Sequence, residues 1–531
     1  MEEIKGELKE NLSEKDIEKR KSKLYKFFFG WVKDNYDRAF LLLLAVAFVV
    51  GLWIFSITRG QPVWYDTANF LSTAKRFALG LDYVNDIWYY RRGFFWVLFS
   101  AFFFKTGIGE IGIQFSGVLF YVGLIFSSYF LIKEMFNKKL ALFTSTLLTF
   151  SWVLLFFIGR SMTEIPASFF LITSLFFFWK GYVLKKGNKF LYLFGVFYAL
   201  ALLTRFQLAM FIFPLLLFIL IKERFNFIKN KHLWITLGII LAILLPFFIL
   251  YFMHYGNVFA DVLSHYFGVS VAPDTPTGFN FIGIFDYFRD LPYILASVKS
   301  VIAPLFIVFL IGAFIFFQDM FLGIDKIFKN EEIQKKFFIF IWIVSALLIL
   351  GYMTSASYIE ERYAIPTYIF LFLIIASFFV KLEGLLVKYL KLKKVLAIML
   401  SFLILLGMTI PGILFANGLI EIKKTSYLEV KQSALWMKEN SNPGDIIISN
   451  SVPYMTYYAE RESYSMDPNR TIFEENVTQL KPRFLMLSLF EAHEPWEYDY
   501  PQEKNMKTVK AFYNNNQPVV IIYEFDYNSS A

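Results

Sequence analysis

Long apolar runs separated by short polar segments dominate the chain from Ala39 to Asn417. A helix needs about 20 predominantly apolar residues to cross a bilayer. The runs therefore predict eleven membrane-spanning helices, at residues 39–57, 112–132, 140–158, 165–184, 190–203, 206–221, 232–254, 300–317, 337–353, 364–380 and 394–416. Residues 94–104 are also apolar, but this run is too short to cross, so it predicts an interfacial or re-entrant helix.

The lysines of the connecting loops indicate how these helices are oriented. If residues 94–104 do not cross, every second loop is rich in lysine, namely the loops at 133–139, 185–189, 222–231, 326–336 and 381–394. Cytoplasmic loops carry an excess of Lys and Arg. We therefore expect the N-terminus in the cytoplasm and the C-terminus outside. A crossing at 94–104 would place the later lysine loops outside.

The polar segments divide the chain into three parts. Residues 1–38 form a charged cytoplasmic segment without the form of a cleavable signal, so residues 39–57 are expected to stay as a signal anchor. Residues 39–420 form the membrane domain, with long outer loops at 59–111 and 255–299. Residues 421–531 form an extracytoplasmic domain.

Helix and strand signals alternate in residues 421–531. Apolar residues recur at helical spacing over 427–440, and the runs at 446–448, 484–489 and 519–523 are typical of short strands. This pattern predicts a small α/β domain with a mainly parallel sheet. No GxGxxG or P-loop motif accompanies it, so the sequence does not predict a nucleotide site.

Composition supports the membrane assignment and excludes several kinds of chemistry. The chain is 57% hydrophobic and 21% aromatic, whereas soluble domains are about half apolar. The absence of cysteine excludes disulfides and thiol catalysis, and the four histidines form no HExxH pair that would indicate zinc. The net charge of +9 comes mostly from the short loops, so we attribute it to topology rather than to nucleic-acid binding.

Two acids follow or precede apolar runs on the predicted outer side. Asp66 lies in the first outer loop before an amphipathic stretch at 67–79, which predicts a helix lying on the membrane surface. Glu164 begins the fourth predicted span. Either acid has an ordinary structural explanation, because Asp caps helices well and Glu is common in the first turn before a proline. Two carboxylates at one membrane surface also predict an active site there.

Several arginines map to the same surface. Arg92, with Arg91, precedes the short apolar helix and either anchors it to lipid headgroups or binds a phosphate. Arg205 lies between two spans with almost no loop, so we expect it somewhat below the membrane surface, where charges usually face a cavity. Arg362 precedes a late span. The sequence therefore predicts one outer site that is built from Asp66, Arg92, Glu164, Arg205 and Arg362.

Four short motifs in this order resemble those of the C-type membrane glycosyltransferases, in particular the group of protein O-mannosyltransferases and aminoarabinose transferases. They are Tyr65-Asp66-Thr67-Ala68, Arg92-Gly93-Phe94-Phe95 followed by Phe104-Lys105-Thr106-Gly107, the segment from Arg160 to Pro166, and Arg362-Tyr363-Ala364-Ile365-Pro366. The segment Tyr457-Tyr458-Ala459-Glu460-Arg461 is similar to part of the outer domain of archaeal and some bacterial members. The resemblance covers most of the chain. Separately, the richness in Lys and Phe without any Cys suits an archaeal source.

The resemblance implies transfer of a sugar from a polyprenyl (dolichyl or undecaprenyl) phosphate to a protein, glycan or lipid acceptor at the outer face. It implies Asp66 as the base, Glu164 as a residue that binds or orients the acceptor, and Arg92, Arg205 and Arg362 as phosphate ligands. Supporting roles are implied for Tyr65, Arg91, Arg160 and Tyr363. The double proline of the family is missing at Gly93-Phe94. Tyr89 and Tyr90 stand where some relatives have a metal-binding acid, so a divalent cation (Mg²⁺ or Mn²⁺) is left open.

Two other classes of function are compatible with a chain of many spans. A transporter or lipid flippase would have ionisable residues near the middle of its spans, and repeated broken helices. The predicted spans are almost free of charge, and no repeat is evident. A membrane-anchored receptor would use its tail as the working part, which does not explain acids and arginines at several span ends.

Overall fold

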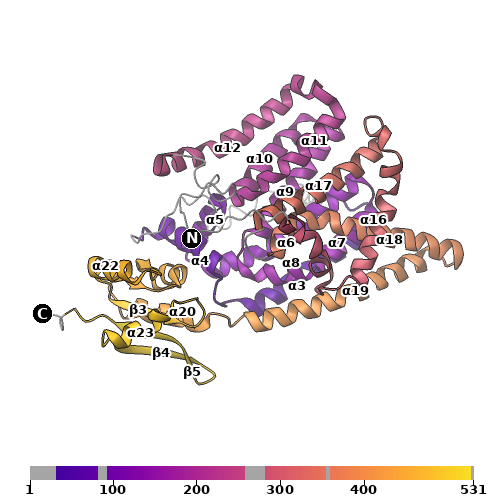
Figure 1. Ribbon diagram of the computed structural model, residues 1–531. Helices are drawn as coiled ribbons and strands as arrows, with labels where there is room; N and C mark the ends of the chain where they lie inside the picture. Colours follow the sequence, from indigo (N-terminus) through magenta and orange to yellow (C-terminus); the bar gives the residue numbers. More distant parts are fainter. Residues whose placement is uncertain (1–30, 82–92, 257–281, 355–358, 528–531) are drawn as a thin grey trace, which may run out of the picture.

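The computed structural model describes residues 31–81, 93–256, 282–354 and 359–527, and shows a large helical bundle joined to a small domain that contains a sheet (Figure 1). Nine helical segments of this described part are long and apolar enough to cross a membrane. They contain α3 (Asn35–Thr58), α6 (Glu110–Met135), α9 (Glu164–Phe178), α11 (Ile212–Glu223), α12 (Lys231–Tyr255), α16 (Pro304–Leu322), α17 (Glu331–Thr354), α18 (Ile365–Tyr389) and α19 (Lys394–Lys423). The predicted polytopic helical membrane fold is confirmed.

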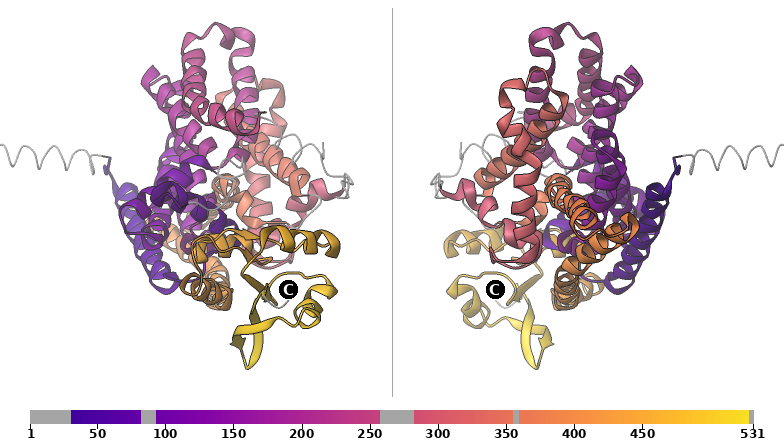
Figure 2. Two further views of the ribbon diagram at one scale, coloured as in Figure 1. Left: turned by 90° about the vertical axis from the view of Figure 1, so that its left-hand side faces the viewer. Right: turned by 90° about the vertical axis from the view of Figure 1, so that its right-hand side faces the viewer.

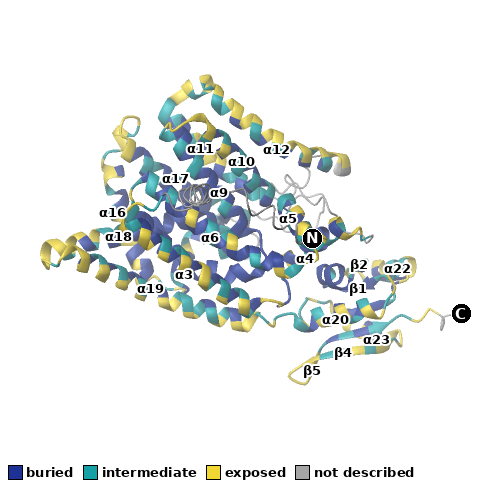
Figure 3. Ribbon diagram, turned by 180° about the vertical axis from the view of Figure 1, so that it is seen from behind, coloured by how far each residue is buried: buried dark blue, intermediate teal, exposed yellow. Residues whose placement is uncertain are grey.

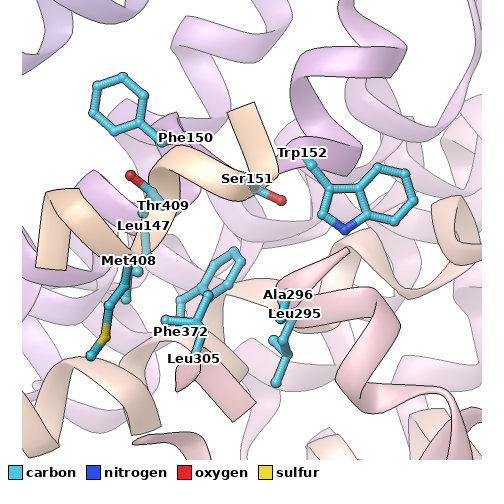
Figure 4. A pocket seen from close by; sticks show the side chains of 11 residues that line it. Leu147, Phe150, Ser151, Trp152, Leu295, Ala296, Leu305, Phe372, Met408 and Thr409 are labelled. Carbon is cyan, nitrogen blue, oxygen red and sulfur yellow. The ribbon is translucent and has the colours of Figure 1, made fainter. Parts of the chain in front are cut away.

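Two of the eleven predicted spans differ from a regular membrane helix. The span predicted at 140–158 consists of α7 (Lys138–Thr149) and α8 (Trp152–Phe157), bent by 49° at the break between them. Trp152 bridges the break to a neighbouring segment, because its Nε1 donates to the carbonyls of Tyr293 and Ile294, each at 3.1 Å. A small, mostly apolar pocket lies beside this break (Figure 4).

The other exception is α10 (Asn188–Thr204), which has 17 residues. At 1.5 Å per residue it is about 26 Å long, shorter than the roughly 30 Å hydrocarbon core. By length and composition the described residues therefore hold nine candidate spans, or ten if the bent pair is one span. α10 ends at Thr204, immediately before the predicted site residue Arg205. The short length of α10 therefore helps to set how far below the membrane surface Arg205 lies.

The lysine-rich helix ends gather at one end of the bundle. Asp37, fully buried near the start of α3, accepts from Lys133 Nζ at 2.8 Å and from Lys138 Nζ at 2.7 Å. Lys139 forms an ion pair with Glu383 of α18, a helix distant in sequence. These contacts join alternate loops, as the predicted alternation of the spans requires.

Two short helices follow α3. α4 (Tyr65–Leu79) ends at Gly80, whose φ of +67° is a conformation that glycine adopts readily, and α5 (Phe94–Lys105) is the short apolar helix expected at 94–104. The apolar face predicted for the first of them, Ala68, Leu71, Ala74 and Ala78, is buried. Ala68 and Leu71 pack in one cluster with Trp96 and with residues of the C-terminal domain. This face therefore packs against protein.

The C-terminal domain holds a five-stranded sheet in the order β2-β1-β3-β5-β4. Its strands are β1 (Ile447–Ile448), β2 (Ser463–Tyr464), β3 (Phe484–Ser488), β4 (Lys507–Asn514) and β5 (Gln517–Glu524). β1 is parallel to β2 and β3, but β3, β5 and β4 are antiparallel neighbours. The sheet is mixed because Asn515 and Asn516, both with positive φ, form the tight turn of a β4–β5 hairpin.

The C-terminal domain docks on α4 and on the start of α6 through the segment Tyr457–Glu460. Lys75 Nζ donates to the Tyr457 carbonyl at 2.9 Å and to Glu460 Oε1 at 3.0 Å. The Tyr457 hydroxyl donates to Glu110 Oε2 at 2.8 Å, and the Tyr458 hydroxyl accepts from the Val63 amide at 3.0 Å. Figure 2 shows this domain packed against the bundle in both side views.

The ion pair between Lys75 and Glu460 is half-buried and crosses this interface. Burial raises the pKa of Glu460, but the hydrogen bond from Lys438 and the charge of Lys75 outweigh it and hold that pKa below its usual 4.5. The carboxylate therefore contributes stability above pH 4.5, and this contribution is lost as the pH falls through its lowered pKa.

Replacing Lys75 with methionine should loosen the domain, since the charged hydrogen bonds lost are worth about 2 kcal/mol. Hydrogen exchange at Tyr457–Glu460 should accelerate. Lys438→Met is the matched control, because Lys438 binds Glu460 Oε2 at 2.7 Å from within the same domain. Equal exchange rates in the two variants would contradict the docking role of Lys75.

Candidate active site

Arg362 lies at the centre of a cluster of charges, just before α18. Its side chain is 6% exposed. Nη2 donates to Asp66 Oδ2 at 2.9 Å, while Nε lies 3.1 Å from Glu360 Oε2 and 3.4 Å from Glu164 Oε1. One guanidinium thus contacts three carboxylates that come from three different parts of the chain.

Glu164 joins Arg362 to a second guanidinium. Its Oε1 accepts from Arg205 Nη1 at 2.8 Å, and the same nitrogen donates to the Thr163 hydroxyl at 3.1 Å. Glu164 begins α9 and Arg205 follows α10, and these two helices are close neighbours in the bundle. Because α9 begins beside the end of α10 in this antiparallel pair, the carboxylate of Glu164 and the guanidinium of Arg205 lie next to each other.

Tyr363 packs against both guanidinium groups. The ring centroid lies 4.7 Å from Arg205 Cζ and 5.2 Å from Arg362 Cζ. A cation close to the face of an aromatic ring is attracted by the ring quadrupole. Tyr363 therefore fixes the two arginines without neutralising their charge.

Asp66 is the open side of the cluster, because its side chain is 53% exposed. It lies in the first turn of α4, but the residue at the N-cap is Trp64, which makes no side-chain cap hydrogen bond. The cap explanation for Asp66 is therefore wrong. Its carboxylate is instead held by Arg362 while remaining accessible to a second molecule.

Glu360 also belongs to this cluster and was not predicted from the sequence. Burial raises the pKa of Glu360; the charges of Asp66 and Glu164 add to this effect, and Arg362 opposes it. The only signal in the sequence is its position two residues before Arg362. The described cluster holds three carboxylates and two guanidiniums, so it is deficient in positive charge unless one acid binds a proton or further cations lie nearby.

Two predicted cations, Arg91 and Arg92, lie outside the described residues. The next residue, Gly93, is described and lies against the end of α10. A Cβ added to Gly93 would stand 1.9 Å from the Thr204 carbonyl oxygen. The chain at Gly93 therefore runs directly beside the backbone that leads into Arg205.

The contact at Gly93 should make Gly93→Ala destabilising. Because the obstacle is backbone, one of the two chains has to shift, at a cost of about 1–3 kcal/mol, and the unfolding temperature in detergent should fall. Gly407→Ala in α19 is the control, since nothing lies within 4 Å of its added Cβ and alanine favours a helix. A Gly93→Ala protein as stable as Gly407→Ala would contradict this contact.

Arg160 lies apart from the cluster. It is 2% exposed, and its Cζ lies 4.9 Å from the Trp64 ring and 4.6 Å from the Phe156 ring. Nη1 lies 3.5 Å from the carbonyl of Lys423, the last residue of α19. This placement suits a residue that positions the end of that helix, where a cation is favourable.

Tyr65, also predicted to support the site, is half-exposed beside Asp66 and faces the Tyr454 ring of the C-terminal domain at 6.4 Å. Among the described residues no three His, Asp or Glu side chains are grouped so as to hold a metal ion. In the cluster at Arg362 the carboxylates of Asp66, Glu164 and Glu360 form ion pairs with guanidinium nitrogens.

Comparison with known proteins agrees with this architecture. Residues 93–250 match the family model of the dolichyl-phosphate-mannose-protein mannosyltransferases. No curated protein sequence matches the chain.

Solved structures extend the likeness to most of the chain. ArnT from Cupriavidus metallidurans bound to undecaprenyl phosphate superposes with a TM-score of 0.59 at 12% identity, covering 91% of this chain and 97% of that one. Its apo structure gives 0.60 at 13% identity with the same coverage.

The archaeal oligosaccharyltransferase AglB from Archaeoglobus fulgidus, in complex with an inhibitory peptide and a dolichol-phosphate, gives a TM-score of 0.56 at 13% identity. This match covers 84% of this chain and 69% of that one. At such identities the structural likeness establishes the fold. The chain therefore has the fold of the C-type membrane glycosyltransferases, and its residues 93–250 match the mannosyltransferase family model within it.

Proposed function

We propose that this multi-pass membrane protein transfers a sugar from a polyprenyl phosphate to an acceptor at the outer membrane face. The observation that carries the proposal is the cluster in which the accessible carboxylate of Asp66 is held by the buried guanidinium of Arg362. The fold and the family match support the general reaction. The structures of ArnT with undecaprenyl phosphate and AglB with dolichol-phosphate suggest the class of donor.

Asp66 suits the role of general base. It would take the proton of an acceptor hydroxyl or amine as the acceptor atom attacks the anomeric carbon. The bond between that carbon and the phosphate oxygen breaks, and the polyprenyl phosphate leaves with the bonding electrons. A single in-line displacement of this kind inverts the anomeric configuration.

The leaving group is a phosphate, which cations stabilise without a strong general acid. Arg362 and Arg205 supply two guanidiniums at one place, and guanidinium binds phosphate oxygens in bidentate geometry. Arg92 is proposed as a third, since Gly93 lies against the backbone beside Arg205. In this proposal donor phosphate replaces a carboxylate on Arg362, which frees Asp66 to act as the base.

The orientation of the chain follows from the same proposal. The cluster and the docked C-terminal domain lie at helix ends opposite the gathered lysines. If those lysines face the cytoplasm, the N-terminus is cytoplasmic and the domain is outside. An outer domain beside Asp66 is well placed to contact the acceptor.

Purified protein in lipid vesicles tests the proposal. We would supply a panel of radiolabelled dolichyl and undecaprenyl phosphate sugars, with peptide, glycan and lipid acceptors, and repeat each assay with EDTA or with added Mg²⁺ or Mn²⁺. The proposal expects turnover of at least one donor by the wild type. The metal arms decide whether a divalent cation takes part. Protein that binds and turns over no donor in the panel would contradict the proposal.

A further inference from the structure

A polar pocket lies at the end of the bundle where the lysine-rich loops gather, opposite the Arg362 cluster. Its volume is about 210 Å³, well above the roughly 10–15 Å³ that one water molecule needs. The pocket lies between the ends of α9 and α11 and the starts of α10 and α12. The polar side chains that line it are Tyr182, Lys185, Asn188, Glu223, Asn230 and His232. The proposed sugar transfer does not use this pocket.

One wall of the pocket comes from a wide helical turn that follows α9. Residues Trp179–Val183 form a π-helical turn, and such turns are frequent at functional sites. Tyr182 of this turn is 3% exposed. Its hydroxyl lies close to the Glu223 carboxylate, but has no hydrogen-bond partner of normal geometry among the described residues. Since an unpaired buried hydroxyl is costly, the pocket wall is completed by a ligand that pairs with Tyr182.

Two helices begin at this pocket. α10 begins at Asn188 and α12 at Lys231, and both Asn188 and Asn230, the N-cap residue of α12, line the pocket. Asn188 Nδ2 lies 3.0 Å from His232 Nε2, a contact that holds the two helix starts side by side. The amides of a first helical turn and the helix dipole both favour an anion. The backbone on this side of the pocket is therefore suited to a negatively charged group.

The charged side chains of the pocket restrict the ligand further. Lys185 lines it without an ion pair to any described residue, whereas the neighbouring Lys186 is paired with Glu134 at 2.8 Å. Lys222 lies close enough for its charge to interact with those of Lys185 and Glu223. A lysine binds a phosphate oxygen by a charge-assisted hydrogen bond, while a carboxylate only accepts hydrogen bonds. The ligand should therefore combine a phosphate with a group that donates to Glu223.

The pocket lies beside apolar side chains that are suited to a membrane surface. The segment between its lining residues Glu223 and Asn230 carries the exposed Phe225 and Ile228, and the exposed Trp234 lies near the start of α12. The Trp234 indole donates to the Ile228 carbonyl at 2.7 Å. Tryptophan is enriched at membrane interfaces, and basic pockets between spans on the cytoplasmic side bind lipid headgroups. A ligand that enters from the bilayer is therefore favoured over a soluble one.

We infer that this pocket binds the headgroup of an anionic glycerophospholipid that carries free hydroxyl groups, as a phosphoglycerol headgroup does. Lys185 and the two helix starts hold the phosphate oxygens. One headgroup hydroxyl donates to the Glu223 carboxylate, and another pairs with the Tyr182 hydroxyl. This lipid site is separate from the proposed donor site and does not depend on the proposed sugar transfer.

Binding of defined lipids to the purified full-length protein in detergent tests the inference. Native mass spectrometry gives the Kd for phosphatidylglycerol, for phosphatidylcholine, and for phosphatidylmethanol, which has the charge of phosphatidylglycerol but no headgroup hydroxyl. Wild-type protein should bind phosphatidylglycerol most tightly. Lys185→Gln should weaken this binding about 5–10-fold, since one charged contact is lost. Lys189→Gln is the matched control and should change the Kd little, because Lys189 is an exposed lysine of the same loop that does not line the pocket.

Glu223→Gln tests recognition of the headgroup hydroxyls. It should reduce the preference for phosphatidylglycerol over phosphatidylmethanol, so that the ratio of the two Kd values approaches one. Lys185→Gln should weaken binding of both lipids by a similar factor, because it removes only a phosphate contact. Thermal unfolding of each variant confirms that it is folded.

Three results would overturn the inference. Equal weakening by Lys185→Gln and Lys189→Gln would mean that the lipid responds only to the general surface charge. Wild-type protein that binds phosphatidylglycerol no more tightly than phosphatidylcholine would exclude an anionic lipid. Inorganic phosphate that displaces phosphatidylglycerol at equal concentration would assign the pocket to a soluble ligand.

Discussion

Asp66→Asn should abolish sugar transfer while leaving a folded membrane protein. A positioned general base typically contributes about 10²–10⁴ in rate, and asparagine cannot accept the acceptor proton. The ion pair lost to Arg362 involves a half-exposed carboxylate, so its removal should cost less than about 1 kcal/mol in stability. Transfer of labelled sugar under single-turnover conditions measures the effect.

Asp445→Asn is the matched control for this variant. Asp445 accepts from Arg483 at 2.7 Å within the C-terminal domain, away from the cluster, so its loss should not change transfer. A well-folded Asp66→Asn protein with activity comparable to that of Asp445→Asn would refute the assignment of Asp66 as base.

Arg362→Met should be damaging to both stability and transfer. Glu164, which is 3% exposed, would keep its charge in a buried setting after losing one of its cations, and breaking a buried ion pair in this way costs about 3–5 kcal/mol. Arg205 still contacts Glu164, so the lower end of that range is expected. The free energy of unfolding in detergent should fall accordingly, and transfer should be lost.

A double variant separates the two effects of Arg362. Arg362→Met with Glu164→Gln removes both partners, so stability should recover in part, as for other buried pairs replaced together. Transfer should not recover, since the cation for the leaving phosphate is still absent. Recovery of transfer along with stability would show that Arg362 acts only as a structural residue.

The sequence predicted the membrane helices because their signal is local. An apolar run of sufficient length predicts a membrane span without any information about the rest of the chain. The short run at 94–104 also correctly predicted the helix α5 (Phe94–Lys105). The run for α10 was also visible, yet its 17 residues fall below the usual length. Which residues cover a buried face is less local information. The apolar face of α4 indicates only that something covers it, and this helix is largely buried in the structure (Figure 3). The part that covers it, the C-terminal domain, is nearly 400 residues away in sequence.

The site was predictable only as far as the topology was. Asp66, Glu164, Arg205 and Arg362 were expected at one membrane face, and the structure brings them into direct contact. Glu360 was not predicted, because charged residues near span ends are common and little in the sequence distinguishes this one. The antiparallel hairpin of β4 and β5 was missed because exposed polar positions of β4 hide its strand character.

The central claim is that the bond between the anomeric carbon and the phosphate oxygen breaks at this site. Mass spectrometry of the products from a single turnover in vesicles tests it most directly. We expect the lipid to be recovered as polyprenyl phosphate and the acceptor to gain one sugar residue, with neither product formed by Asp66→Asn. Intact donor moved to the opposite leaflet, or free sugar phosphate with polyprenol, would contradict it.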